Sequence, residues 1–295
     1  MRNLLLIFTL SALSTNALKA QQATHIFLSV ISKTEDGFNF STPKQISEGS
    51  GYHNQPSFSD KSTLLFASTR QKQTDIASYN ITENTLKWKS NTLGGSEYSP
   101  QRIPNSNAIA AVRLDTNGLQ RFYKYRDGKT PELLLENLQV AYYCFTAPDK
   151  ILASVLENNT LALVEANLHL QQIDTIFFGG SGRSFHSKPD SNTIAYTMIN
   201  EAEANRVEIY LNEEDDSFFV CQLPIGIQDF TWLTEDIFVI GSRNQLYTYN
   251  TIGNYIWTLA HTFKDTPIDA ISRIAVSPDG KYLAFAATLK TTDGQ

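Results

Sequence analysis

The chain has 295 residues, of which 41% are hydrophobic and 18% are charged, and its formal net charge is −6. This composition is that of a globular protein with enough apolar material for a large core. The net negative charge argues against a nucleic-acid-binding groove, which requires a stripe of basic residues.

The first twenty residues, MRNLLLIFTLSALSTNALKA, have the layout of a secretory signal peptide. One Arg precedes an apolar run from Leu4 to about Leu13, and small and polar residues follow it. The run is too short to span a bilayer, and no later stretch contains about 18 consecutive apolar residues. We therefore expect residues 1–20 to be a signal peptide, cut after Ala17 or Ala20. Residues 21–295 are expected to form one exported domain, periplasmic or extracellular, with no membrane span.

The segment after the signal peptide contains two predicted strands. Thr24–Ile31 has the pattern of Thr74–Ile81 further along the chain, and a second strand is expected near Phe38–Ile46. No hairpin of the type described next precedes these two strands.

Six related hairpins then follow at regular intervals, each ending in a short apolar strand. Equivalent apolar positions in these strands are 42 to 46 residues apart, and they are Leu64, Ile109, Ile151, Ile194, Ile237 and Leu283. In the first five units a second pair of strands follows the hairpin, and no unit has an apolar face of helical period. A period of about 40–45 residues with four strands per unit indicates an all-β propeller of six blades.

The expected second strand pairs have polar turns between their members. Their ranges are 74–81 and 85–90, 121–125 and 131–135, 160–164 and 171–177, 206–211 and 218–222, and 245–250 and 255–259. The Asp127-Gly128 turn of the second pair is a strong hairpin signal.

The last hairpin, IAVSPDGKYLAFAA at 274–287, is the clearest copy. Its segment Ser277–Gly280 suits a tight type I turn. The following strand alternates Leu283 and Phe285 with alanines, so both of its faces are apolar and both should be covered. Only eight residues follow Ala287, too few for a second hairpin. We therefore predict that the strands at 24–31 and 38–46 complete the sixth blade, which removes the open sheet edges.

The two cysteines fall on different blades of this arrangement. Cys144 is expected on an inner strand of the third blade and Cys221 on an outer strand of the fourth. A disulfide requires Cα atoms within about 7 Å. We therefore predict two buried free thiols.

The repeated pattern P-S-F-S-x-D…L-x-F-x-S, followed by T-D-I-x-x-Y-x-I, resembles the WD40-like repeats of the TolB-like six-bladed propellers. Gln55–Asn80 and Ile274–Phe285 carry the resemblance best, and it extends from about Thr24 to Thr288. The resemblance implies an exported scaffold, usually without catalysis of its own. TolB itself has an additional N-terminal domain, which we do not expect here, and a role in the Tol–Pal envelope system is not expected either.

Candidate binding residues gather on one face of the predicted disc. Because four strands run alternately in each blade, the loops after the second and the fourth strands open on the same side, and loops commonly carry binding residues. The candidate ligand-binding residues on this face are His53, Gln55, Arg70, Tyr98, Arg113, Tyr142, Arg183, His186, Arg243 and Arg273.

We hypothesise that these residues ring the mouth of a central channel. A convergent set of cations in a concave mouth would attract an anionic or sugar-like ligand, or the acidic peptide of a partner protein. The alternative is that each cation caps a loop or pairs with a neighbouring acid, such as Asp115 or Glu157.

Catalytic and metal-binding interpretations have less support. The chain contains no H-E-x-x-H and no G-x-S-x-G motif. Ser184 and His186 have no third group to orient the base. The possible metal ligands are His53 and Gln55 on the first blade and His186 on the fourth. Because these two blades are opposite each other in a six-bladed ring, their loops are expected to be too far apart to hold one ion. We predict no catalytic residue, no metal and no cofactor.

The sequence therefore predicts an exported, monomeric and non-enzymatic binding module, whose ligand is a protein or a small anionic or sugar-like molecule. The first alternative is a metal-dependent lyase or hydrolase that acts on carbohydrate or lactone at the same mouth. The second is a structural member of an envelope complex.

Overall fold

The computed structural model describes residues 23–35, 37–213 and 216–291. The expected signal peptide, residues 1–20, lies outside these ranges. Across the ranges that are described, no helix is both long and apolar enough to cross a membrane.

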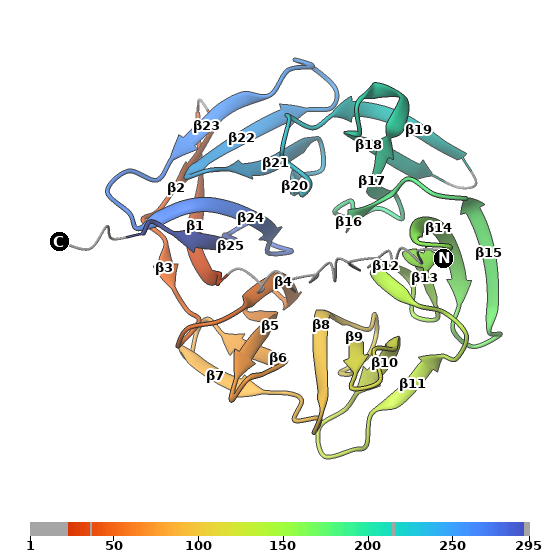
Figure 1. The fold of residues 1–295 in the computed structure, drawn as a ribbon. Helices are drawn as coiled ribbons and strands as arrows, with labels where there is room; N and C mark the ends of the chain where they lie inside the picture. Colours follow the sequence, from red (N-terminus) through yellow and green to blue (C-terminus); the bar gives the residue numbers. More distant parts are fainter. Residues whose placement is uncertain (1–22, 36, 214–215, 292–295) are drawn as a thin grey trace, which may run out of the picture.

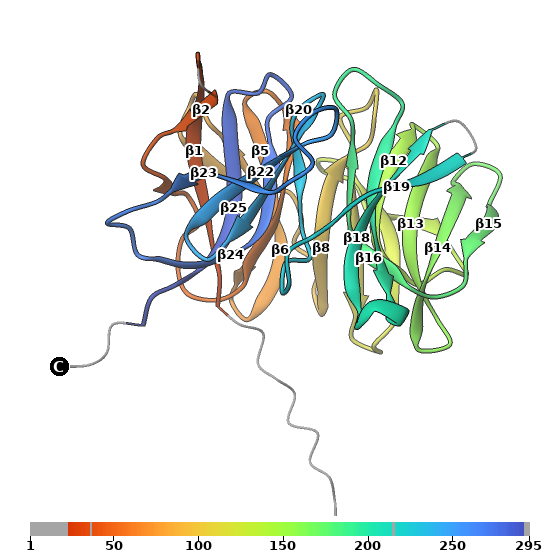
Figure 2. The same cartoon turned by 90° about the horizontal axis from the view of Figure 1, so that it is seen from above.

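Six antiparallel sheets are arranged as blades around a central axis, which confirms the predicted six-bladed β-propeller (Figure 1). Viewed from its edge, the molecule is a disc in which the strands run from one face towards the other (Figure 2). Five blades have four strands each, and the sixth contains one additional short strand.

The strands of each blade follow one another outwards from the axis. Blade 1 contains β4 (His53–Asp60), β5 (Thr63–Arg70), β6 (Gln73–Asn80) and β7 (Thr85–Trp88). Blade 2 contains β8 (Gly95–Arg102), β9 (Ile109–Asp115), β10 (Gln120–Tyr125) and β11 (Glu132–Leu135). Blade 3 contains β12 (Val140–Ala147), β13 (Lys150–Glu157), β14 (Thr160–Asn167) and β15 (Gln172–Phe177). Blade 4 contains β16 (Ser181–Ser187), β17 (Ile194–Asn200), β18 (Arg206–Glu213) and β19 (Asp216–Gln222), with a 3₁₀ turn, η1 (Glu201–Glu203). Blade 5 contains β20 (Thr231–Thr234), β21 (Ile237–Ser242), β22 (Gln245–Asn250) and β23 (Thr258–Thr262). Blade 6 contains β24 (Ile268–Val276) and β25 (Tyr282–Leu289), together with β1 (His25–Thr34), β2 (Gly37–Phe40) and β3 (Lys44–Gln45).

The turn between β24 and β25 forms as its residues predict. The Gly280 N–H donates to the Ser277 carbonyl oxygen (2.8 Å), and Gly280 has φ +67°, a conformation that glycine adopts at little cost. The Ser277 hydroxyl donates to Asp279 (2.8 Å) and accepts from the Tyr282 N–H (2.9 Å), which fixes the first residue of β25.

The core consists of six clusters of buried apolar side chains, each of which joins two adjacent blades. In β25, Leu283 and Phe285 pack towards blade 5, whereas Ala284 and Ala286 pack towards blade 1. The second strand of a blade is therefore covered on both faces, which explains why its sequence is apolar throughout.

Blade 6 is closed by strands from both ends of the described chain. β1 pairs antiparallel with β25 from His25 opposite Ala287 to Val30 opposite Tyr282, and β2 and β3 pair with β1. Phe27 is buried and stacks on Phe285, with 5.5 Å between ring centroids. The predicted closure is thus confirmed.

Both cysteines lie where the repeat places them. Cys144 is on the inner strand β12 and Cys221 on the outer strand β19, and both are buried and unpaired, as predicted. Burial raises the pKa of the Cys221 thiol to about 12. Two strands differ clearly from their expected ranges. β23 begins at Thr258, whereas the sequence pattern predicts 255–259, and the single strand expected near Phe38–Ile46 is divided into β2 and β3.

His53 lies at the junction between the closing strand and blade 1. Thr24 Oγ1 donates to the His53 carbonyl oxygen (3.0 Å), and the His53 N–H donates to the Thr24 carbonyl oxygen (3.2 Å). The His53 ring is fully buried, contacts the Ser68 hydroxyl through Nδ1 (2.7 Å) and lies 5.7 Å from the His25 ring. Burial, with a smaller effect of His25, lowers the pKa of His53 from 6.5 to about 4.

We expect this histidine to make the fold sensitive to acid. Because the folded-state pKa is below the unfolded value, the stabilisation is complete above pH 6.5 and is lost as the pH falls towards 4. The loss attributable to His53 is about 3 kcal/mol, at 1.36 kcal/mol per pKa unit. Urea unfolding at neutral and acidic pH measures it. His53→Gln should flatten this pH dependence, whereas replacement of the exposed His169 by Gln should not, and equal profiles for all three proteins would contradict the assignment.

Candidate functional site

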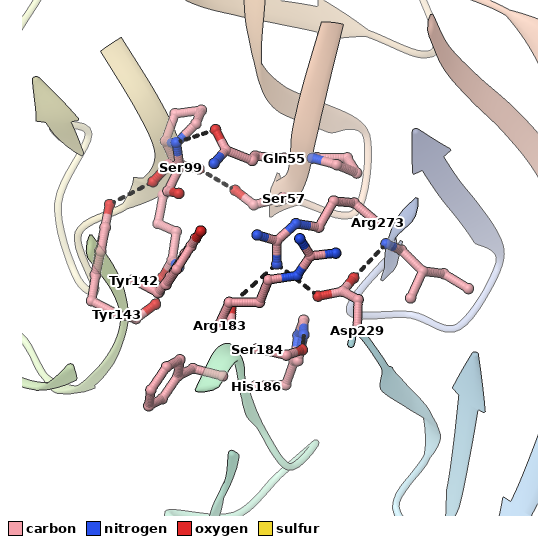
Figure 3. Close-up of a pocket in the computed structure, with 15 residues that line it drawn as sticks. Gln55, Ser57, Ser99, Tyr142, Tyr143, Arg183, Ser184, His186, Asp229 and Arg273 are labelled. Atoms are coloured by element: carbon pink, nitrogen blue, oxygen red, sulfur yellow. Dashed lines mark hydrogen bonds and ion pairs between the residues drawn. The ribbon is translucent and has the colours of Figure 1, made fainter. Parts of the chain in front are cut away.

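A cavity on the central axis is lined by residues from all six blades (Figure 3). The innermost strands of blades 1, 2, 3, 4 and 6 all have irregular pairing at this level. Such β-bulges turn a side chain out of the regular alternation. The residues at or beside these irregularities that line the cavity are Gln55, Ser99, Tyr142, Arg183 and Arg273. Blade 5 supplies Asp229, which precedes β20.

Arg273 and Asp229 form an ion pair in the cavity wall. Arg273 Nη1 donates to Asp229 Oδ1 (2.9 Å), and their side chains are only 12% and 8% exposed. Asp229 Oδ2 accepts from the Ile274 N–H (2.9 Å), so both carboxylate oxygens are engaged. Burial opposes the charge of Arg273, but Asp229 and the nearby Tyr142 outweigh it and raise the pKa of Arg273. The pair joins the loop before blade 5 to the inner strand of blade 6.

Arg183 lies beside this pair without a carboxylate of its own. Its Nη2 is 3.5 Å from the Ser272 carbonyl oxygen, and its buried Nε has no hydrogen-bond partner within the described chain. Burial and the neighbouring Arg273 lower the pKa of Arg183, although Asp229 acts in the opposite direction. Two guanidinium groups therefore share one carboxylate, and the cavity carries an excess positive charge.

Tyr142 and Tyr143 line one side of the cavity, and Tyr52 lies near Tyr142 outside the lining. The guanidinium of Arg273 lies over the Tyr142 ring, 5.1 Å from its centroid. Tyr52 packs edge-on against Tyr98 (5.9 Å between centroids), and burial, despite the nearby Arg273, raises the pKa of Tyr52 to about 12. The Tyr52 hydroxyl is therefore protonated at neutral pH and can donate a hydrogen bond.

Blade 4 contributes a hydrogen-bonded serine and histidine to the cavity wall. Ser184 Oγ is 3.1 Å from His186 Nε2, and His186 Nδ1 is 3.4 Å from the Thr231 hydroxyl. Burial, only partly opposed by Asp229, lowers the pKa of His186 to about 4, so the ring is neutral at physiological pH. The second ring nitrogen therefore faces a hydroxyl group and not the carboxylate that would orient a catalytic base.

Three cavities meet at Arg183. The axial cavity has a volume of about 70 Å³, and a second one of about 110 Å³ also has Arg183, Asp229 and Arg273 in its wall. A third, of about 230 Å³, is bounded by Tyr142 and Arg183. This space suits a small ion or the charged end of a larger molecule.

The structure brings half of the predicted binding residues to this cavity: Gln55, Tyr142, Arg183, His186 and Arg273. His53 is fully buried at the blade 6–blade 1 junction, Tyr98 packs on Tyr52 outside the lining, and Arg243 is exposed in the turn after β21. Arg70 and Arg113 line a separate groove between blades 1 and 2.

Local acidic partners hold these two arginines away from the axis. Arg70 Nε is 2.8 Å from Asp75 Oδ2, and Arg113 Nε is 2.6 Å from Asp115 Oδ1. Both arginines therefore follow the alternative interpretation of the sequence, in which a cation pairs with a neighbouring acid. For Arg113 this acid is Asp115, as that interpretation suggested.

Sequence reasoning misses Asp229 and Ser99. Asp229 is the only carboxylate among the residues that line the axial cavity. Ser99 has φ +50° and its N–H donates to Gln55 Oε1 (2.8 Å), so it links the first two blades.

The described side chains do not gather the ligands of a metal site. Among the residues that the structure describes, no group of three or more His, Cys, Asp or Glu side chains is placed to hold a metal ion. His53 and His186, the two histidines considered for such a site, have separate surroundings on blades 1 and 4.

Known structures share the fold of this chain at low sequence identity. A TolB-type protein from Agrobacterium tumefaciens aligns over 91% of this chain and 99% of its own, with 10% identity and a TM-score of 0.68. A gluconolactonase from Xanthomonas campestris aligns over 91% and 97%, with 9% identity and a TM-score of 0.61. An oligogalacturonate lyase in complex with manganese aligns over 85% and 80%, with 11% identity and a TM-score of 0.55.

No protein-family model and no curated protein matches the sequence. The structural matches establish a TolB-like propeller fold. Since that fold occurs both in a TolB-type protein and in enzymes, its function has to be argued from the site.

Proposed function

We propose that the protein is a binding protein whose axial cavity captures the anionic group of a small ligand, best matched by the carboxylate of a hydroxy acid or sugar acid. The observation that carries this proposal is the half-buried guanidinium of Arg183, which lies where three cavities meet, has a buried Nε without a hydrogen-bond partner in the described chain, and forms no ion pair of its own. A buried charge without a counter-charge is costly, and a bound anion would remove that cost.

The rest of the lining supports the same ligand class. Gln55 Nε2 has no protein partner among the described residues, and Tyr142 adds a hydroxyl group to the same cavity. Donors of this kind, next to a guanidinium, match a carboxylate that carries adjacent hydroxyl groups.

We further propose that residues 1–20 act as a signal peptide and that the propeller works outside the cytoplasm as a monomer. The support is the charge and hydropathy pattern of residues 1–20, together with the likeness of the fold to a TolB-type protein.

Isothermal calorimetry with glucuronate, phosphate and glucose tests the binding proposal. We expect glucuronate to bind and neutral glucose not to bind, while phosphate shows whether a carboxylate is specifically required. Arg183→Met should weaken glucuronate binding about tenfold or more, because a charge-assisted hydrogen bond contributes about 1.5–3 kcal/mol.

The matched control is Arg243→Met, which removes an exposed arginine from the same face of the disc. This variant should bind like the wild type. Equal affinity of the Arg183→Met protein for the anion, or no anion binding by the wild type, would refute the proposal.

A hydrolase or lyase that acts on carbohydrate or lactone is the second candidate. Two proteins that share the fold are a gluconolactonase and an oligogalacturonate lyase, and Asp229 and His186 lie in the same cavity here. Turnover of a sugar lactone that is lost in both Asp229→Asn and His186→Gln, but kept in Arg243→Met, would favour the enzyme.

A further inference from the structure

A long groove separates blades 1 and 2 on the side of the disc. Its larger part has a volume of about 700 Å³ and is formed by the segment after β7 and by the β10–β11 hairpin. A smaller cavity of about 160 Å³ continues it along the same blade boundary. The residues that line both parts are Lys89, Tyr125, Arg126 and Asp127.

Basic side chains outnumber acidic ones in the lining of this groove, although the whole chain is acidic. The six cationic residues of the groove are Arg70, Lys89, Arg102, Arg113, Arg126 and Lys129. Three of these basic residues form ion pairs with acids just outside the lining: Arg70 with Asp75, Arg113 with Asp115, and Arg126 with Glu132. Only two carboxylates, Asp60 and Asp127, line the groove, whereas the chain as a whole has a net charge of −6. A cleft that is lined mainly by charges of one sign attracts ligands of the opposite charge.

Two of these cations have no acidic partner in the described structure. Arg102 donates to the carbonyl oxygens of Ser106 (2.6 Å) and Ser59 (3.4 Å) and to Asn107 Oδ1 (3.2 Å), none of which is charged. Lys129 is exposed in the β10–β11 turn and takes part in none of the ion pairs of the described chain.

A third cation, Lys89, forms an ion pair that an incoming ligand can replace. Lys89 Nζ lies 2.8 and 3.1 Å from the two carboxylate oxygens of Asp127, which is 79% exposed. Exposed ion pairs of this type contribute little free energy, about 0–1 kcal/mol, so an incoming carboxylate can replace Asp127.

We propose that the groove between blades 1 and 2 binds an acidic peptide segment of a partner protein. The mixed lining favours a peptide over a uniformly anionic polysaccharide. A peptide presents carboxylates to the cations and backbone N–H groups to Asp60 and Asp127, whereas a polyanion would be repelled at these two acids. The open aromatic face that a sugar ring would stack on is also occupied, because Arg70 lies 4.2 Å from the Trp88 ring centroid.

The test uses a fluorescent peptide rich in Glu and Asp, with an otherwise identical Gln and Asn peptide as the neutral probe. Fluorescence anisotropy at low ionic strength should show binding of the acidic peptide only. The double variant Arg102→Gln/Lys129→Gln should weaken this binding about tenfold, at up to about 1 kcal/mol per charge. Added salt should weaken it further.

Two controls separate this site from other effects. The double variant Lys33→Gln/Lys264→Gln removes the same charge from exposed positions outside the groove and should bind like the wild type. Arg183→Met should also leave peptide binding unchanged, because Arg183 lines the axial cavity. The proposal is overturned if the acidic peptide does not bind, if both double variants bind it equally, or if dextran sulfate binds in the groove while the peptide does not.

Discussion

Replacement of Phe27 by alanine is expected to lower the free energy of unfolding by about 3–5 kcal/mol, the usual cost of deleting a buried aromatic side chain. Phe27 is 2% exposed and stacks on Phe285 in the cluster that joins blades 5 and 6. Because β1 completes blade 6, the loss should weaken the closure of the whole ring. Chemical denaturation with urea, monitored by tryptophan fluorescence, measures the change.

Val30 provides a matched control on the same strand. Its side chain is 50% exposed, so Val30→Ala should change stability by less than about 1 kcal/mol. Similar small effects of both substitutions would mean that β1 is not part of the cooperative core, and that the ring is not closed by this strand.

Asp229→Asn is expected to destabilise the protein by about 3–5 kcal/mol, because removing one partner of a buried ion pair leaves the other charge uncompensated. The variant leaves two guanidinium groups in the cavity without a carboxylate, and an amide cannot accept hydrogen bonds from Arg273 and Ile274 through both of its terminal atoms. The midpoint of urea unfolding should therefore fall clearly.

Added phosphate should restore part of this stability, because a ligand that binds only the folded state stabilises it. A second change, Arg183→Met in the Asp229→Asn background, should restore stability without any anion. Asp190→Asn removes an exposed carboxylate of blade 4 and should have almost no effect. A stable Asp229→Asn protein that is indifferent to phosphate would show that the cavity charges are not coupled in this way.

The fold could be predicted from the sequence because the repeat fixes both the number of blades and their boundaries. The apolar strands recur every 42 to 46 residues. In the structure each of them is the second strand of a blade, and its two faces pack against the blades on either side. The closure could be predicted as well, since 24–31 has the pattern of a third strand whose blade is otherwise incomplete. The start of β23 could not be predicted correctly because the apolar residues Tyr255 and Ile256, which the sequence pattern places in the strand, are exposed and precede it in the structure.

The site could be predicted only in part because the inner strands are bulged. Counted back from the apolar position of each blade, the six residues at the axis lie 8 to 11 positions away, so no fixed offset finds them all. Gln55 and Arg183 fall within the predicted loops, whereas Asp229 has the shortest offset and is missed. A β-bulge adds a residue to one strand only, and the sequence carries no clear signal for where this occurs.

The direction in which each arginine side chain points could not be predicted from the sequence either. Arg70, Arg113 and Arg273 are all located near the same face by the repeat, yet the first two turn towards Asp75 and Asp115 on their own blades. Arg273 instead reaches an acid on a neighbouring blade. Such a contact depends on the three-dimensional arrangement of the blades, not on spacing within one of them.

Anion capture at Arg183 is tested most directly by soaking crystals of the protein with selenate, a tetrahedral anion whose selenium gives an anomalous signal. The account predicts an anomalous peak in the axial cavity, with the anion within hydrogen-bonding distance of the Arg183 guanidinium, and no such peak in Arg183→Met crystals. Selenate bound only at surface lysines, with none in the cavity of the wild-type protein, would contradict it.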